Sequence, residues 1–213
     1  MFQEPEFSLK RDIALTVAVE AAGFKITNSK SIPTEDGYAW HATLVHGLTK
    51  IVTVSNGGTG GEDHSDFHAT TDVAKAADKI RLQELFAIPE VTAVLRDHLL
   101  YNLNLSQQFN KVSESDYFAS KDQIAGSTPV PSVDNVEYLV GYLATAFKLA
   151  NELKRALKTK LVFVRKGQDA TGEYGWYVKP DTAANRATAQ GKQSGTIDYF
   201  VADLFATAKE GMV

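Results

Sequence analysis

The clearest chemical pattern in the sequence is a basic stretch between residues 154 and 192, in a chain that is otherwise acidic. Nine lysines and arginines stand there against three acids, so the stretch carries a net charge of +6. The chain as a whole carries −4, which leaves −10 on the remaining residues. Clustered cations of this kind neutralise phosphates. The bases are Lys154, Arg155, Lys158, Lys160, Arg165, Lys166, Lys179, Arg186 and Lys192.

Three aromatic residues lie inside this stretch, at Tyr174, Trp176 and Tyr177. Rings beside positive charge can stack on the bases of a flexible nucleic-acid strand. In a strand, Tyr174 and Trp176 would share one face and Tyr177 would take the other. The alternative is that Trp176 is a core residue and that the bases up to Lys160 solvate a helix end. The predicted nucleic-acid site therefore comprises Lys160, Arg165, Lys166, Tyr174, Trp176, Tyr177, Lys179, Arg186 and Lys192.

A glycine-rich loop is a second candidate site. Asn56 is followed by Gly57, Gly58, Gly60 and Gly61, with Thr59 between the pairs. Such a loop could bring backbone N–H groups close to a phosphate, although it lacks the lysine and hydroxyl of a P-loop. The alternative interpretation is structural, a strand exit that needs positive φ.

A possible metal site follows at His64, Asp66 and His68. In an extended segment these three side chains would point the same way, and two imidazoles with a carboxylate can ligate zinc, iron or manganese. The competing interpretation is a solvated polar loop, and it is favoured. We therefore expect no cofactor and no bound metal.

Enzymatic signatures are weak elsewhere in the sequence. It contains no Gly-x-Ser-x-Gly elbow, and no spacing assigns a nucleophile, base and acid. His98, among Leu95, Leu99 and Leu100 on an expected helix, is predicted to be a half-buried histidine with its hydrogen bonds satisfied. The protein is predicted not to be an enzyme.

Composition limits the class of protein further. The 213 residues are 44% hydrophobic and 23% charged, which is ordinary for a soluble globular protein. The absence of cysteine excludes disulfides, zinc–thiolate sites and cysteine nucleophiles. The first residues lack the pattern of a secretory signal, and no apolar run approaches the roughly 20 residues that span a bilayer. A cytoplasmic location and no membrane partner are expected.

The N-terminal part is predicted to be rich in strands. Residues 8–22 combine strand-like alternation with helix-like alanines, and a helix is slightly favoured. A strand is expected over residues 24–32. The clearest hairpin joins residues 38–46 to residues 50–55 through a turn at Gly47.

The middle of the chain is predicted to be helical. One helix is expected to start at Thr71-Asp72 and to end before Pro89, where a second helix begins. Residues 119–133 contain serine, glycine and proline and are predicted to be a loop. A long amphipathic helix follows, with Asp134 and Glu137 in the spacing of a capping box.

The C-terminal part is predicted to contain a second hairpin. Residues 161–164 have the pattern of a buried strand, and residues 174–178 are its expected partner across residues 167–172. Helices are predicted over residues 182–190 and 197–209. The whole is an α+β fold: an N-terminal sheet with a β-hairpin, a helical middle, and a C-terminal β-hairpin with helices. It is predicted to be one domain over 1–213, which could divide into 1–118 and 134–213.

Two segments resemble a group of small phage and bacterial proteins without an established activity. The first is YAWHATLVHGLTKIVTVSNGGTGG, where Asn56, Gly58, Gly60 and Gly61 match the group's loop and Gly57 replaces its usual acid. The second is LKTKLVFVRKGQDATGEYGWYVKP, with a basic helix end, an apolar strand and a Gly-Glu-Tyr turn. The resemblance implies a phage origin and supplies no catalytic residues.

The function expected from the sequence is a phage-type nucleic-acid-binding protein. Single-stranded DNA is the favoured ligand, and the protein is expected to support replication or transcription. A polymerase or another protein could be its partner, and the chain could form a homo-oligomer. Two alternatives remain open. One is an accessory protein that inhibits a host factor through the tip at residues 57–61, and the other is a metal-dependent enzyme using His64, Asp66 and His68.

Overall fold

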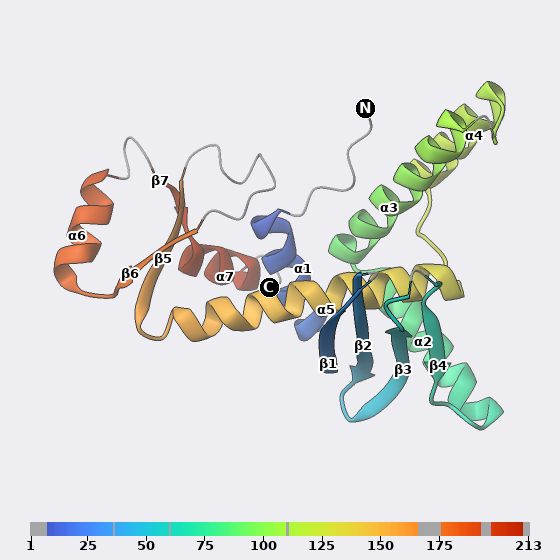
Figure 1. Ribbon diagram of the computed structural model, residues 1–213, viewed down its shortest axis with the longest axis horizontal. Coiled ribbons are helices and arrows are strands. Elements are labelled where there is room, and N and C mark those ends of the chain that lie inside the picture. Colours follow the sequence, from blue (N-terminus) through green and yellow to red (C-terminus); the bar gives the residue numbers. More distant parts are fainter. Residues whose placement is uncertain are drawn as a thin grey trace. The chain divides into compact units, whose positions relative to one another are not determined.

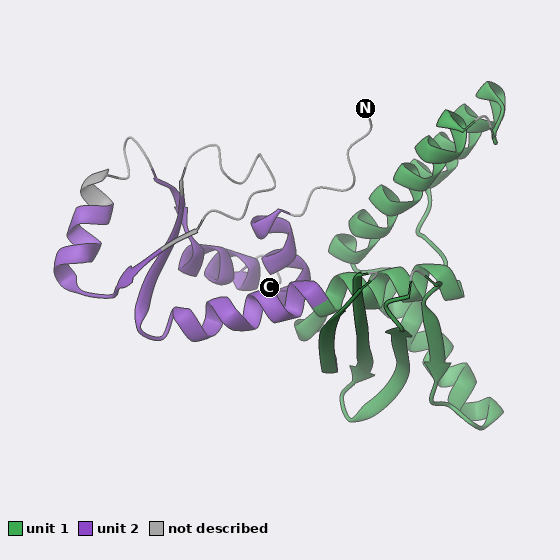
Figure 2. Ribbon diagram, in the orientation of Figure 1, with its two compact units in different colours: residues 1–5, 19–144 green, residues 6–18, 145–213 purple. Residues whose placement is uncertain are grey.

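The computed structural model describes residues 8–35, 37–59, 61–109, 111–165, 176–192 and 197–210. It is α+β, as predicted, with a four-stranded antiparallel sheet, helices in the middle, and a three-stranded sheet with helices (Figure 1). The chain forms two compact units. Unit 1 comprises residues 1–5 and 19–144, and unit 2 comprises residues 6–18 and 145–213 (Figure 2). Most of unit 1 is therefore inserted between two segments of unit 2.

Within the described residues, the crossings between the units fall inside helices. The first crossing lies in α1 (Leu9–Ala21), where the favoured helix is confirmed, and the second lies in α5 (Val133–Ala156). The expected loop over 119–133 is wrong in its first half, because residues 119–126 complete α4 (Glu114–Gly126). The Oγ of Ser113 caps this helix by accepting from the backbone N–H of Asp116 at 3.2 Å.

The sheet of unit 1 has the strand order β1-β2-β3-β4. The predicted hairpin is confirmed, and its turn residue Gly47 has a φ of 58°. Ala42 and Leu44 pair with Val54 and Val52, and all four are buried on one face. A short fourth strand lies where a polar loop was favoured. The strands are β1 (Phe24–Thr34), β2 (Gly37–His46), β3 (Thr49–Asn56) and β4 (His64–Phe67).

A row of polar residues crosses the sheet of unit 1. Thr27 pairs with Thr43, Thr43 with Thr53, and Thr53 with Asp66, one residue from each strand. The Oγ1 atoms of Thr43 and Thr53 are 2.9 Å apart, and Thr53 Oγ1 is 2.8 Å from Nε2 of His68. Hydrogen bonds thus satisfy the hydroxyl groups of Thr43 and Thr53.

Helices α2 (Asp72–Phe86) and α3 (Pro89–Gln108) begin where the sequence predicts. Thr71 caps α2 through a hydrogen bond from the backbone N–H of Ala74, and the first turn of α3 buries Val91. Helix α4 packs along α3, and the hydroxyl of Tyr117 donates to Oδ1 of Asn104 at 2.7 Å. No helix in the described part of the chain is long and apolar enough to cross a membrane.

His98 of α3 contacts α5, and it is half-buried and hydrogen-bonded as predicted. Its ring stacks on Tyr138 with a centroid distance of 3.5 Å, and Nδ2 of Asn102 lies 3.1 Å from its Nε2. Burial lowers the pKa of His98 because desolvation disfavours the charged imidazolium. The neutral ring is thus the form that this contact favours.

The long helix α5 is capped two residues earlier than the sequence predicts, at Ser132 instead of Asp134. Ser132 is the capping residue, since its Oγ accepts from the backbone N–H of Asn135 at 3.2 Å. Glu137 does not complete a capping box with Asp134, because its Oε1 accepts from the hydroxyl of Ser65 in β4 at 2.6 Å. The expected box at Asp134 is wrong, and Glu137 instead ties the helix to the sheet of unit 1.

Unit 2 contains the three-stranded sheet, in the order β6-β5-β7. The pairing of β5 with β6 confirms the second predicted hairpin. The expected helix over 197–209 is wrong in its first turn, because residues 197–200 form the third strand and pair with β5. The elements are β5 (Lys160–Arg165), β6 (Trp176–Pro180), α6 (Ala183–Lys192), β7 (Ile197–Phe200) and α7 (Val201–Glu210).

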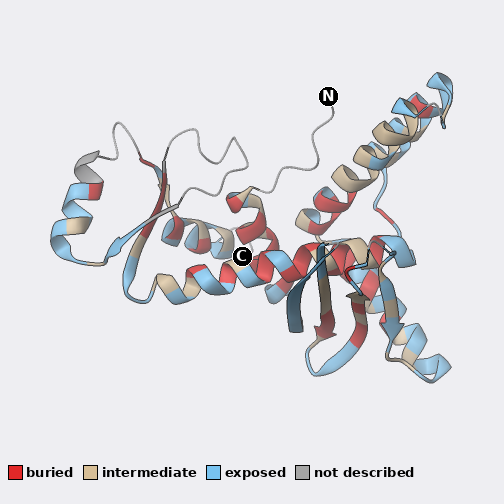
Figure 3. Cartoon of the chain, in the orientation of Figure 1, coloured by how far each residue is buried: buried red, intermediate tan, exposed pale blue. Residues whose placement is uncertain are grey.

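Both faces of the central strand β5 are covered (Figure 3). Val162 and Val164 pack with residues of α1, α5 and α7 in one cluster. Phe163 packs with Ala189 of α6 and Ile197 of β7 in another. The middle of β5 is therefore an apolar layer between helices.

Candidate nucleic-acid interface

One end of the three-stranded sheet gathers basic side chains from two turns. Lys160 opens β5 opposite Pro180, and Lys179 in β6 pairs with Leu161. The backbone N–H of Asp181 donates to the carbonyl of Thr159 at 3.1 Å. This hydrogen bond holds the turn between α5 and β5 beside the turn between β6 and α6.

Five exposed cations lie at or beside these two turns, and we call them the basic edge. They are Arg155, Lys158, Lys160, Lys179 and Arg186. Lys160, Lys179 and Arg186 belong to the site predicted from the sequence, whereas Arg155 and Lys158 were assigned to the helix end. The positive charges of Arg155 and Lys158 can be counted in the sequence. The hydrogen bond that joins the two turns, and so brings these residues to the site, cannot be predicted from it.

The only acid among residues 155–160 and 179–186 is Asp181. Its carboxylate makes a two-point contact with Arg186: Nε donates to Oδ1, and Nη2 donates to Oδ2 at 2.5 Å. The hydrogen bond from Arg186 lowers the pKa of Asp181, and the same bond raises the pKa of Arg186. Both groups are therefore charged at neutral pH, and their charges cancel.

The rest of the predicted site lies outside what the structure describes. Lys166 and Tyr174 are outside the described residues, and so are the side chains of Arg165, Trp176, Tyr177 and Lys192. The backbone of β6 places Trp176 opposite Val164 and Tyr177 opposite Phe163. Stacking of these aromatic rings on nucleic-acid bases stays a prediction.

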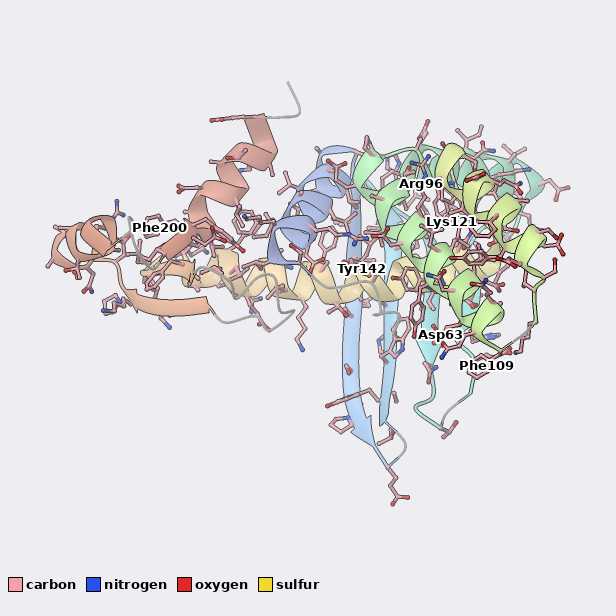
Figure 4. All side chains as sticks on the ribbon, turned by 90° about the horizontal axis from the view of Figure 1, so that it is seen from above. Asp63, Arg96, Phe109, Lys121, Tyr142 and Phe200 are labelled. Carbon is pink, nitrogen blue, oxygen red and sulfur yellow. The ribbon has the colours of Figure 1, made fainter. Side chains whose placement is uncertain are left out.

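The glycine-rich loop is organised by one side chain, that of Asn56. Its Oδ1 accepts from the backbone N–H of Gly58 at 2.7 Å, and its Nδ2 donates to the carbonyl of Gly61 and to Oδ1 of Asp63. Asp63 is labelled in Figure 4. The amide of Gly58, which the sequence offered as a phosphate donor, is thus already used inside the loop.

Gly58 also has a packing reason to be glycine. Its φ is 71°, and its carbonyl accepts from the hydroxyl of Thr34 at 2.7 Å. A Cβ at this position would lie 2.5 Å from the backbone nitrogen of Ala39. The contacts therefore favour the structural interpretation at Asn56, Gly58 and Gly61. A Cβ at Gly57 would meet only Thr59 Oγ1, and Gly60 lies outside the described residues.

The three possible metal ligands do not converge. His64 and Asp66 lie on β4, opposite Ser55 and Thr53, and both are exposed. The Nε2 atom of His68 is hydrogen-bonded to Thr53. Within the described residues, no group of three or more histidine, aspartate or glutamate side chains could hold a metal ion.

Comparisons of the chain with protein-family models, with curated proteins and with solved structures found no match. The resemblance to a phage group therefore stays a prediction, and the functional argument depends on the residues of the two units.

Proposed function

We propose that the chain binds single-stranded nucleic acid through the basic edge of unit 2. The observation that carries the proposal is the gathering of five exposed cations around two turns joined by the Thr159–Asp181 hydrogen bond. Exposed cations on adjacent turns can follow the phosphates of a flexible strand. The acidic remainder of the chain disfavours non-specific coating of duplex DNA, because like charges repel along its length.

The proposed biological setting is phage replication or transcription, with the protein acting on exposed single strands. The resemblance of residues 38–61 and 157–180 to phage proteins supports this setting, and no catalytic chemistry is needed for it. Trp176 and Tyr177, adjacent to the edge in sequence, are proposed to supply stacking surfaces. Each base stacked on an aromatic ring contributes about 1–3 kcal/mol and tolerates any sequence.

The decisive experiment measures binding of a fluorescent oligonucleotide across a salt series. Single-stranded DNA, duplex DNA and RNA of the same length are compared. For the single strand, the double variant Lys160→Gln and Lys179→Gln should bind roughly tenfold more weakly. The salt slope, which is the slope of the logarithm of the binding constant against the logarithm of the salt concentration, should also become shallower by about 1.4. Each phosphate contact contributes about 0.7 to this slope.

A matched control uses two exposed lysines of unit 1, Lys75 and Lys79 of α2, in the double variant Lys75→Gln and Lys79→Gln. This variant loses the same charge and should bind like the wild type. Equal losses in both double variants would show that total charge, and not the basic edge, governs binding. Failure of the wild type to bind any oligonucleotide at low salt would remove the proposal.

A further inference from the structure

Arg186 is the most constrained cation of the basic edge. Its partner Asp181 precedes α6, where Thr182 Oγ1 accepts from the backbone N–H of Asn185 at 3.2 Å. Nδ2 of Asn185 also donates to the carbonyl of Pro180 at 2.8 Å. Together with the bond from Asp181 to Thr159, these contacts fix the backbone that carries the carboxylate. The pairing with Arg186 is therefore built into the start of the helix.

The pair is open to solvent, unlike the Arg81–Asp78 pair of unit 1. The Arg186 side chain is 63% exposed and that of Asp181 is 23% exposed. In unit 1, Arg81 Nη1 contacts Asp78 Oδ1 at 2.6 Å, and the Asp78 side chain is only 8% exposed. A ligand can thus reach the guanidinium of Arg186, whereas the pair in α2 is part of the packed unit.

The two-point contact has the geometry by which arginine binds phosphate. A carboxylate and a phosphate each offer two oxygens to two parallel N–H groups, so they compete for the same guanidinium edge. While Asp181 holds that edge, the pair carries no net charge and attracts a phosphate weakly. Substituting Asp181 would restore one positive charge to the basic edge.

We infer that Asp181 is an internal competitor for the phosphate of a bound strand, so that it sets the affinity of the basic edge. This inference rests on the proposed function. In the bound state, a backbone phosphate takes the place of the carboxylate on Nε and Nη2 of Arg186. The affinity of the chain is therefore lower than its cations allow, which makes release of a strand easier.

The first test compares Asp181→Asn with the wild type in the oligonucleotide assay. The variant should bind single-stranded DNA about fivefold more tightly. This is the gain expected in water when a negative charge about 4 Å from the cation that binds the phosphate is removed. Its salt slope should be steeper by about 0.7, one additional phosphate contact. Adding Arg186→Gln to Asp181→Asn should abolish the gain.

The matched control is Asp203→Asn, which removes an exposed acid from α7 in the same unit. This control should change affinity less than twofold, because no cation of the basic edge is released. Circular dichroism should show that the three variants keep their helices. An Asp181→Asn variant that binds no more tightly than Asp203→Asn overturns the inference.

A second test needs no nucleic acid. Inorganic phosphate is titrated while the Nε–H resonance of Arg186 is followed by NMR, in the wild type and in Asp181→Asn. Phosphate should shift the resonance at a lower concentration in the variant. If this difference is seen and no oligonucleotide binds, the proposed function fails while the competition by Asp181 stands. If phosphate shifts both proteins equally, the competition is refuted even where oligonucleotides bind.

Discussion

The two sheets of the molecule use polar side chains in opposite ways. In unit 1, polar groups bond to one another: Thr43 to Thr53, Thr53 to His68, and Asn56 to the loop that follows β3. In unit 2, the central strand is apolar on both faces, and the charged groups lie at its end, exposed. A polar group that is satisfied inside a packed sheet is less available to a ligand than a charged group at an exposed edge. We therefore expect the residues that bind a ligand to lie in unit 2.

The largest effect should come from the apolar layer of unit 2. Phe163 is buried, with its ring 6.3 Å from that of Phe200, a residue labelled in Figure 4. Phe163→Ala should lower the free energy of unfolding by about 3–5 kcal/mol, because it removes buried area and leaves a cavity. Chemical denaturation measures the change. The exposed Phe118 of α4 is the control, and Phe118→Ala should cost less than about 0.5 kcal/mol.

The glycine loop should give the next largest effect, in unit 1. Gly58→Ala places a Cβ against the backbone of Ala39 at positive φ, so a loss of about 3 kcal/mol in unfolding free energy is expected. Gly57→Ala is the control, since its Cβ would meet only Thr59 Oγ1, at 3.9 Å. Equal stability of the two variants would contradict the structural interpretation of the loop and reopen it as a ligand site.

The polar row should give a smaller effect. Thr53→Val keeps the shape of the side chain but removes the hydroxyl between Thr43 and His68. The hydroxyl of the buried Thr43 and Nε2 of the half-buried His68 then lose this partner. We expect a loss of about 1–3 kcal/mol. Ser55→Ala, two residues along the same strand, should change stability by less than about 0.5 kcal/mol. If the two substitutions cost the same, hydrogen bonding within the sheet does not distinguish unit 1 from unit 2.

The smallest effect should be the pH dependence of the α3–α5 contact. Burial lowers the pKa of His98 in the folded chain, so the unfolded chain takes up a proton first as the pH falls. The stability of the wild type should therefore decline as the pH drops through about 6.5, the usual pKa of histidine. Denaturation midpoints at pH 7.5 and 5.5 should differ less in His98→Gln. An unchanged difference would mean that other groups cause the decline.

Much of the fold could be predicted because local signals and tertiary packing agree. The hairpin of β2 and β3 has alternating apolar residues and a glycine at the turn, and α3 begins with proline at its first position. Residues 119–126 were assigned to a loop for their serine and glycine content. The cap at Ser113 and the bond from Tyr117 to Asn104 outweigh that composition. The cap is a local signal that the composition argument passed over, whereas the bond joins two helices and could not be inferred from local sequence.

The third strand of unit 2 shows a different limit. Residues 197–200 form a strand because Phe163 and Val164 of β5 pair with them, a long-range contact. The candidate site was predictable to a similar extent. Lys160 and Lys179 come together through the predicted hairpin, whereas the capture of Arg186 by Asp181 depends on the turn into α6. Charge can be counted in a sequence, but its neutralisation depends on this geometry.

The insertion of unit 1 into unit 2 also sets an order of events on the ribosome. Val17 of α1 shares a core with Val201 of α7, which is added 184 residues later. At about 5–20 residues per second, this interval is roughly 10–40 s. All of the strands and helices of unit 1 are synthesised during this interval. The apolar side of α1 cannot complete its packing until α7 has been added. The segment proposed to bind nucleic acid thus emerges after residues 19–144 of unit 1, and the nascent chain gains that activity only once this part of unit 1 has been synthesised.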